Sequence, residues 1–195
     1  MPRIVVVSSL TLDGVMQAPG RPDEDTRDGF THGGWAVPYG DGVMAKAMGE
    51  RMSGDGVLLF GRRTYQDLYG YWPNQPANPY TDRLTKAEKY VVSRTLTEPL
   101  GWQNSTLVTG DVPAAVAGLK ASTDICVLGS GELCRTLMAH DLVDEYLLLV
   151  HPLVLGAGRR LFPDGSPVAD LELADSVTTT TGVVIGHYRV RGGTR

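Results

Sequence analysis

Short apolar runs and amphipathic stretches alternate along the first three quarters of the chain. The apolar runs are rich in β-formers and almost continuous, as in strands that are covered on both faces. They predict strands at residues 3–9, 57–60, 89–92, 105–108, 125–128 and 145–150. The stretches between them predict helices after Asp41 and Asp111, which can serve as N-caps, and at residues 63–69, 81–87 and 130–139.

The pattern changes after Pro152, where turns and β-rich segments replace the alternation. Residues 171–179 and 183–190 flank a turn at residues 178–182, which predicts an antiparallel hairpin. Alternating strands and helices that end in a hairpin predict an α/β fold. We expect a mixed, mostly parallel sheet flanked by helices, with the hairpin at its edge, in a single domain covering residues 1–195.

Residues 13–40 show no periodic pattern and contain many glycines, prolines and aspartates. A stretch of this length without regular structure is usually a lid, a binding loop or disordered. The helix predicted after it carries Met44, Met48 and Met52 on one face. Core packing explains this methionine stripe most simply, although methionine also suits the wall of a substrate site.

Composition excludes several classes of protein. The 195 residues are 42% hydrophobic and 21% charged with a net charge of −4, and no basic stripe suggests nucleic-acid binding. No apolar run approaches the ~20 residues of a membrane span, and the N-terminal run is too short for a signal peptide, so we expect a cytoplasmic protein. The two cysteines and four histidines show no metal-ligand spacing, so no metal site is expected.

Two strand-to-helix junctions carry the most chemical information. At residues 61–64 and 129–131 an apolar run ends on glycine, and small or basic residues then open a helix. Unpaired helix-start N–H groups and the positive dipole end meet there without an obstructing side chain, which suits a phosphate. An exposed basic helix start is the alternative interpretation of residues 61–64. Ser93 and Arg94 follow a third strand, and three such sites on one sheet fit a nicotinamide dinucleotide phosphate best.

The second junction does not match an ordinary Rossmann fingerprint. Cys134 occupies the place of the third glycine, and the junction follows a late strand rather than the first one. A serine-hydrolase elbow, Gly-x-Ser-x-Gly, is also missing from the sequence. His151 precedes Pro152 at a strand end and could face the site, but this is the less favoured interpretation.

Five short motifs occur in the order of a known family, at residues 9–14, 60–65, 92–94, 128–133 and 151–162. Through them the chain resembles the dihydrofolate reductase-like superfamily. It is most similar to the C-terminal reductase domain of the bifunctional riboflavin-biosynthesis deaminase-reductase and its stand-alone bacterial relatives. The resemblance implies a dihydrofolate reductase-like fold, NADPH bound across the strand ends, residues 13–40 as the active-site lid, and a homodimer.

The resemblance also implies which residues bind the cofactor. The adenosine-side phosphates would contact Gly61, Arg62, Arg63 and Thr64, with Ser93 and Arg94 on the 2′-phosphate side. The pyrophosphate and nicotinamide ribose would lie over Gly129, Ser130 and Gly131, whose motif continues with Glu132 and Leu133. The nicotinamide would be flanked by Ser8, Ser9, Asp13 and Gly14.

The chain departs from its relatives in two ways. Dihydrofolate reductases place a carboxylate early in the first helix, where it binds the pterin ring, and residues 35–41 resemble that segment only loosely. Asp41 is therefore a candidate substrate-binding group or proton donor, and a plain N-cap role is equally consistent. The zinc deaminase half is missing, because no His-x-Glu with Pro-Cys-x-x-Cys occurs.

The leading hypothesis is an NADPH-dependent reductase that acts on a C=O or C=N group of a small polar heterocyclic or sugar-like molecule. A pterin or dihydrofolate reductase that depends on Asp41 is the second. The third is a non-catalytic NADP-binding or interaction module. In that case the acidic residues Asp23, Glu24, Asp25 and Asp28 would belong to a surface segment rather than a lid.

Overall fold

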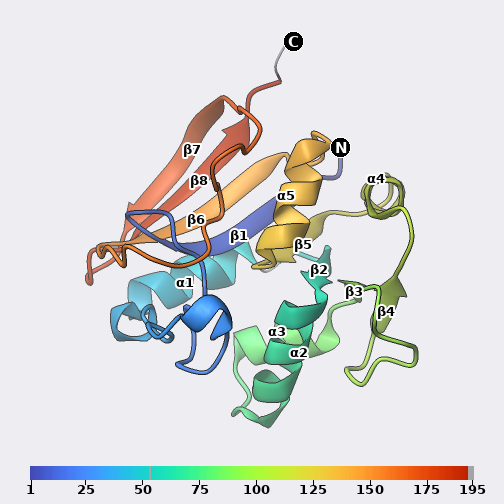
Figure 1. The fold of residues 1–195 in the computed structure, drawn as a ribbon, viewed down its shortest axis with the longest axis horizontal. Helices are drawn as coiled ribbons and strands as arrows, with labels where there is room; N and C mark the ends of the chain where they lie inside the picture. The colour runs from blue at the N-terminus through green and yellow to red at the C-terminus, as the bar shows by residue number, and fades with distance from the viewer. Residues whose placement is uncertain (53, 193–195) are drawn as a thin grey trace.

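A single eight-stranded sheet organises the protein (Figure 1). The computed structural model describes residues 1–52 and 54–192. The strands lie in the order β4-β3-β2-β5-β1-β6-β8-β7. Their bounds are β1 (Ile4–Thr11), β2 (Val57–Gly61), β3 (Lys89–Val92), β4 (Ser105–Val108), β5 (Ile125–Leu128), β6 (Glu145–His151), β7 (Leu171–Thr178) and β8 (Val184–Val190).

The pairing of these strands confirms the predicted fold class. β1 is parallel to β5 and β6, β2 is parallel to β3 and β5, and β3 is parallel to β4. β8 is antiparallel to both β6 and β7, so the C-terminal hairpin adds to one edge of a parallel sheet. Because the parallel strands share a direction, their carboxyl ends lie side by side along the same end of the sheet.

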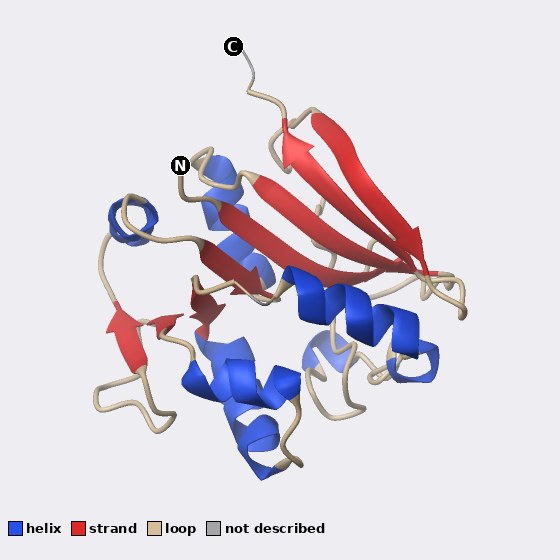
Figure 2. Cartoon of the chain, turned by 180° about the vertical axis from the view of Figure 1, so that it is seen from behind, coloured by secondary structure: helices blue, strands red, loops and turns tan. Residues whose placement is uncertain are grey.

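Helices cover both faces of the sheet, as Figure 2 shows from behind. They are α1 (Gly42–Arg51), α2 (Arg62–Tyr71), α3 (Pro79–Lys86), α4 (Val112–Lys120) and α5 (Gly131–Ala139). Leu59 of β2 packs in the cluster that contains α4 and α5, whereas its neighbour Phe60 packs in the cluster that contains α1, α2 and α3. This alternation with a period of two is why the strands read as continuously apolar. None of the helices in residues 1–52 and 54–192 has the length and apolarity to span a membrane.

Side chains that cap helices explain where several helices begin. Asp41 caps α1 by accepting a hydrogen bond from the Met44 N–H, and Asp111 caps α4 in the same way. Asn78 caps α3, which therefore begins at Pro79, two residues before the predicted start. A short 3₁₀ turn, η3 (Trp72–Asn74), follows α2.

The irregular segment at residues 13–40 is folded, although its only helical elements are the turns η1 (Arg27–Gly29) and η2 (Val37–Tyr39). Val15, Ala18, Phe30 and Trp35 form a small buried cluster of their own. The Trp35 indole N–H donates to the backbone oxygen of Gln17 at 2.8 Å. The segment is thus an organised loop over the edge of the sheet where the parallel strands end.

Candidate functional site

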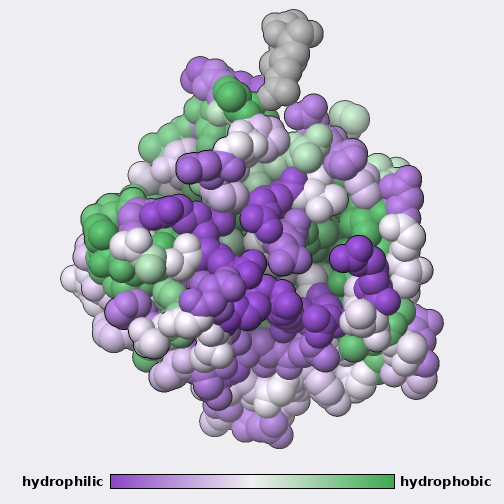
Figure 3. All heavy atoms as spheres, in the orientation of Figure 1, coloured by the Kyte–Doolittle hydropathy of each residue, from purple (hydrophilic) through white to green (hydrophobic). Residues whose placement is uncertain are grey.

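A cavity of about 1370 Å³ lies at the carboxyl ends of the parallel strands. Hydrophilic side chains gather around the middle of this face (Figure 3). The residues predicted to bind a cofactor come from four separate segments, and most of them line this one cavity. They are Ser8, Ser9, Gly61, Arg62, Arg63, Thr64, Ser93, Arg94, Gly129, Ser130, Gly131, Glu132 and Leu133.

Ser130 connects the two glycine junctions. Its Oγ accepts a hydrogen bond from the Gly61 N–H at 2.8 Å and donates to Thr64 Oγ1 at 2.9 Å. Gly61 and Thr64 belong to the β2–α2 junction, whereas Ser130 belongs to the β5–α5 junction. The two predicted phosphate sites are therefore parts of one connected surface.

The backbone of the second junction is held in an uncommon conformation. Gly129 and Ser130 both have positive φ angles, +54° and +64°. A left-handed conformation is costly for a residue with a side chain, and such strain is often found at functional sites. Here it turns the chain sharply at the end of β5, so that Ser130 reaches β2.

The helices that start at the two glycine junctions lack side-chain caps. The residues before α2 and α5, Gly61 and Ser130, make no side-chain cap hydrogen bond to the helix that follows. By contrast, α1, α3 and α4 are each capped by the side chain before them. Unpaired N–H groups at a helix start need a partner, and an anion is the natural one. The two uncapped helices thus direct spare donors and positive dipole ends toward the same cavity.

Guanidinium groups surround these helix starts. Arg94 is exposed and has no hydrogen bond or ion pair within residues 1–52 and 54–192, and Arg62 bonds only the exposed Gln66 of its own helix. Glu132, in the first turn of α5, is approached by Arg27, Arg63 and Arg159 at 3.7 to 3.8 Å. Arg27 and Arg159 are also paired with Asp25 and Asp28. Arg62 and Arg94 are therefore the guanidinium groups that remain available to an anionic ligand.

The serines predicted to contact a cofactor have a structural role as well. Ser93 is buried, and its Oγ accepts hydrogen bonds from the Thr95 and Leu96 N–H groups, which forms the turn after β3. Ser8 is buried near the end of β1, and its hydroxyl donates to the Ser9 backbone oxygen at 3.3 Å. These hydroxyls shape the floor of the cavity from strand ends.

Asp41 does not line the cavity, which corrects its assignment as a catalytic group. Its Oδ1 caps α1 through Met44, and its Oδ2 accepts the N–H and the hydroxyl of Thr180, at 2.7 and 2.5 Å. These hydrogen bonds, led by the Thr180 hydroxyl, lower the pKa of the carboxyl. The structure thus supports the alternative role, an N-cap that also fastens α1 to the hairpin turn.

Asp13 and Gly14 also lie outside the cavity lining, contrary to their predicted place beside the nicotinamide. The Asp13 carboxylate accepts hydrogen bonds from the Thr11 hydroxyl and from the N–H groups of Leu155 and Gly156. The Thr11 hydrogen bond is the main reason that its pKa is lowered. This side chain joins the end of β1 to the segment after β6, which is a structural role.

His151 also has a structural role. It is 1% exposed, packs edge-on against Trp35 and Tyr39, and does not line the cavity. Burial lowers its pKa, and its Nδ1 lies within hydrogen-bonding distance of the Leu10 and Leu149 backbone oxygens. A neutral imidazole that holds loop residues against β6 fits these contacts.

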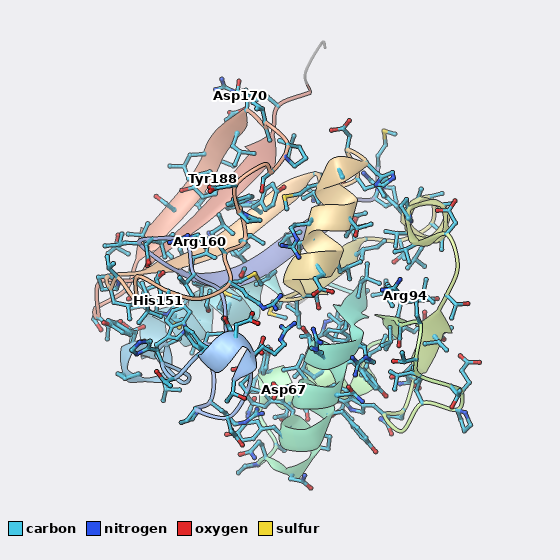
Figure 4. All side chains as sticks on the ribbon, viewed as in Figure 1. Asp67, Arg94, His151, Arg160, Asp170 and Tyr188 are labelled. Carbon is cyan, nitrogen blue, oxygen red and sulfur yellow. The ribbon has the colours of Figure 1, made fainter. Side chains whose placement is uncertain are left out.

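One part of the cavity has an apolar wall and carboxyl groups. Met48 of α1 and Met52, which follows that helix, line it together with Leu68, Tyr80 and Leu149. All three methionines of the predicted stripe pack in or against the core. Met48 and Met52 also line the cavity, whereas Met44 does not. The carboxyl groups come from loop residue Glu24 and helix residue Asp67. Asp67 is labelled on α2 in Figure 4.

Several lining residues were not predicted from the sequence. Arg27, Arg159 and Arg160 lie in irregular segments, and only the family motif at residues 151–162 gave any signal for the last two. Glu24 and Asp67 carried no signal of their own. They become recognisable only when the loop is folded against α2.

Comparison with known proteins decides the family. Residues 2–185 match the RibD C-terminal domain. The chain belongs to the RibD C-terminal domain family. It is also 33% identical over 144 residues to the uncharacterized protein YyaP of Bacillus subtilis (strain 168), which covers 70% of this chain and 74% of YyaP. The uncharacterized protein YwjB of the same organism is 27% identical over 137 residues, or 68% of this chain and 73% of YwjB.

Solved structures show the same fold as this RibD C-terminal domain protein. A putative riboflavin biosynthesis protein from Shewanella sp. PV-4 matches with a TM-score of 0.68 at 20% identity, covering 97% of this chain and 99% of that one. A pyrimidine reductase-like protein from Corynebacterium diphtheriae matches with a TM-score of 0.69 at 13% identity, covering 98% and 93%. The predicted dihydrofolate reductase-like fold is confirmed.

Proposed function

We propose that the protein is an NADPH-dependent reductase of a C=O or C=N group in a small polar heterocyclic or sugar-like substrate. The observation that carries this proposal is the pair of uncapped helix starts joined through Ser130 at one cavity. Membership of a family of reductase domains supports it. The glycine at position 61 leaves space for a phosphate to approach the backbone closely.

The residues present fit a dinucleotide phosphate. The N–H groups at the starts of α2 and α5 would bind the pyrophosphate, and Arg62 and Arg94 would take the 2′-phosphate as planar two-pronged donors. When bound, NADPH supplies the hydride chemistry, and the protein supplies orientation, electrostatics and the exclusion of water. The loop at residues 16–27, which lines the cavity, is placed to exclude water.

The size of the cavity leaves room for a second molecule. Sites for single drug-sized ligands are typically ~300–1000 Å³, whereas this cavity has about 1370 Å³. Its part beside Arg62, Arg94 and the two uncapped helix starts suits the dinucleotide. Its part beside Met48 and Met52, with carboxyl groups nearby, suits a flat molecule that has polar edges.

The two alternative functions make different predictions. A pterin or dihydrofolate reductase would need Asp41 as the carboxylate that binds the substrate. The two oxygens of Asp41 instead accept hydrogen bonds from the Met44 N–H and the Thr180 hydroxyl. A non-catalytic module would bind NADPH but leave it unoxidised.

A turnover screen tests the proposal. Purified protein and NADPH should be mixed with riboflavin-pathway intermediates, dihydrofolate and simple sugar aldehydes, while NADPH absorbance is followed. Consumption of NADPH that depends on one of these compounds supports a reductase. Tight binding of NADPH without consumption would favour the non-catalytic module.

We predict that Arg62→Ala and Arg94→Ala lower the affinity for NADPH but barely change the affinity for NADH. A charge-assisted hydrogen bond contributes about 1.5–3 kcal/mol, which corresponds to about one to two powers of ten in affinity. Binding of each cofactor can be measured by calorimetry for both variants.

Arg191→Ala is the matched control. Arg191 pairs with Asp170 near the free end of the C-terminal hairpin, far from the cavity (Figure 4). The control should bind both cofactors like the wild type. Equal losses of NADPH and NADH affinity in the Arg62 or Arg94 variant would contradict the assignment to the 2′-phosphate.

A further inference from the structure

Two carboxyl groups at the cavity differ in how they are paired. The Asp67 carboxylate on α2 forms an ion pair with Arg21, whose guanidinium also stacks on Tyr71. Glu24 lies on the same loop as Arg21, is half-buried, and forms no ion pair with any residue in 1–52 or 54–192. Burial raises the pKa of the Asp67 carboxyl in spite of this ion pair. The two groups therefore differ in that Asp67 has a cationic partner and Glu24 has none among the described residues.

The two oxygens of Glu24 have different surroundings. Oε2 accepts hydrogen bonds from the Gly20 and Arg21 backbone N–H groups, at 2.6 and 3.1 Å. Within the described ranges Oε1 has no hydrogen-bond partner, and it is not shut off from solvent. A proton on Glu24 would thus sit on Oε1, because Oε2 is already occupied as an acceptor.

The surroundings of Glu24 favour its protonated form, mainly through burial. Burial raises the pKa of its carboxyl, and the Asp67 carboxylate adds to the rise. Arg21 and the two backbone N–H groups oppose it but do not reverse it. From α3 the buried Tyr80 also lies close enough to interact with Glu24. Asp23, the remaining acid beside Arg21, is 85% exposed and screened by water.

We propose that Glu24 is the proton donor of the reduction, with Oε1 delivering the proton to the oxygen or nitrogen of the substrate double bond. This inference rests on the proposed function and replaces Asp41 in that role. Arg21 and Asp67 act as positioning residues, because their ion pair holds the Glu24 loop against α2.

The step balances in electrons and atoms. The substrate carbon accepts a hydride, with its two electrons, from a reduced nicotinamide cofactor. The electron pair of the C=O or C=N π bond moves to the oxygen or nitrogen, which takes the proton from Glu24. The products are an alcohol or amine, the oxidised cofactor and a Glu24 carboxylate, which regains a proton from solvent. A carboxyl group whose pKa is raised by burial, as that of Glu24 is, suits a general acid in such chemistry.

Glu24→Gln is the decisive variant. The glutamine oxygen can still accept the two backbone N–H groups, so the loop should keep its conformation, but the amide cannot deliver a proton. With the compound of the screen that the wild type reduces fastest, we expect kcat to fall by about 100-fold to 10,000-fold. The affinity for NADPH should stay unchanged, and the fall of the rate at high pH should disappear from the pH profile. Glu172→Gln, an exposed change on β7, is the matched control and should behave like the wild type.

A second readout needs neither cofactor nor substrate. Infrared difference spectra recorded during a pH titration should show a protonated carboxyl group with a midpoint above that of an ordinary glutamic acid, ~4.3. This band should be missing in Glu24→Gln and present in Glu172→Gln. An ordinary midpoint, or an unchanged kcat in Glu24→Gln, would overturn the role of Glu24 alone. Failure of the wild type to bind NADPH would remove the proposed function itself.

Discussion

Replacing Gly61 with valine should lower the affinity for NADPH by about a hundredfold while leaving the fold intact. A Cβ at this position would lie 3.4 Å from Ser130 Cβ and Oγ, and the two methyl groups of valine would extend into the junction. The phosphate could then no longer approach the N–H groups at the start of α2. Losing two charge-assisted hydrogen bonds would cost about 3 kcal/mol, which is about two powers of ten.

The backbone at Gly61 makes this test selective. Its φ and ψ of −78° and 157° are ordinary extended values, so a side chain adds no backbone strain. Gly70→Val, in the helix α2 that follows Gly61, is the control, because a Cβ there would meet nothing within 4 Å. Thermal unfolding and calorimetry should show two folded variants of which only Gly70→Val binds NADPH normally. Normal binding by Gly61→Val would contradict a phosphate site at this junction.

Replacing Lys89 with methionine should lower the free energy of unfolding by about 2–4 kcal/mol at neutral pH. Lys89 is fully buried at the start of β3, and its Nζ donates to the backbone oxygens of Thr85, Ala87 and Gln103 at 2.8 to 3.2 Å. Methionine would fill a similar volume but leave these oxygens without the donor, at about 1–3 kcal/mol for each one left unpaired, partly offset because no buried charge remains. Urea unfolding measures the difference.

Lys86→Met is the control for this variant. Lys86 is exposed at the end of α3, and among the described residues its side chain pairs with Asp82, one turn away on the same helix. Its loss should change the stability by about 0.5 kcal/mol or less. A stability of Lys89→Met equal to that of Lys86→Met would show that the three oxygens find other partners.

Lys89 also predicts a dependence on pH. Burial lowers its pKa from 10.5 to about 8. Between these pH values the unfolded chain holds a proton that the folded protein has released, so the stability of the wild type relative to Lys89→Met should rise with pH across this window. Below about pH 8 both states are protonated, and the difference should be constant. A fall in relative stability across the window would contradict a buried lysine with a lowered pKa.

Most of the fold could be predicted because the strands are covered on both faces. Such strands are apolar without interruption, and the segments between them carry helix caps such as Asp41 and Asp111. The small core of the loop at residues 13–40 could not be predicted. Phe30 and Trp35 have no periodic spacing there, and their burial depends on contacts with Val15 and Ala18.

The site, like the fold, contains residues that could be predicted from the sequence and residues that could not. The glycine junctions were recognisable because their chemistry is local, a strand end that passes directly into a helix start. Asp41 and Asp13 were misplaced because a carboxylate near a strand end or helix start can equally cap a turn, and only tertiary contacts show where it points. Glu24 was missed for the opposite reason, since its position in the cavity depends on the ion pair between Arg21 and Asp67.

We propose that the cavity at the starts of α2 and α5 binds a dinucleotide phosphate. The most direct test is a paired calorimetric titration of the wild-type protein with NADPH and NADH. We expect NADPH to bind more tightly by about one to two powers of ten, because only NADPH carries the 2′-phosphate that Arg62 and Arg94 would hold. Equal affinities for the two cofactors, or no binding of either, would contradict it.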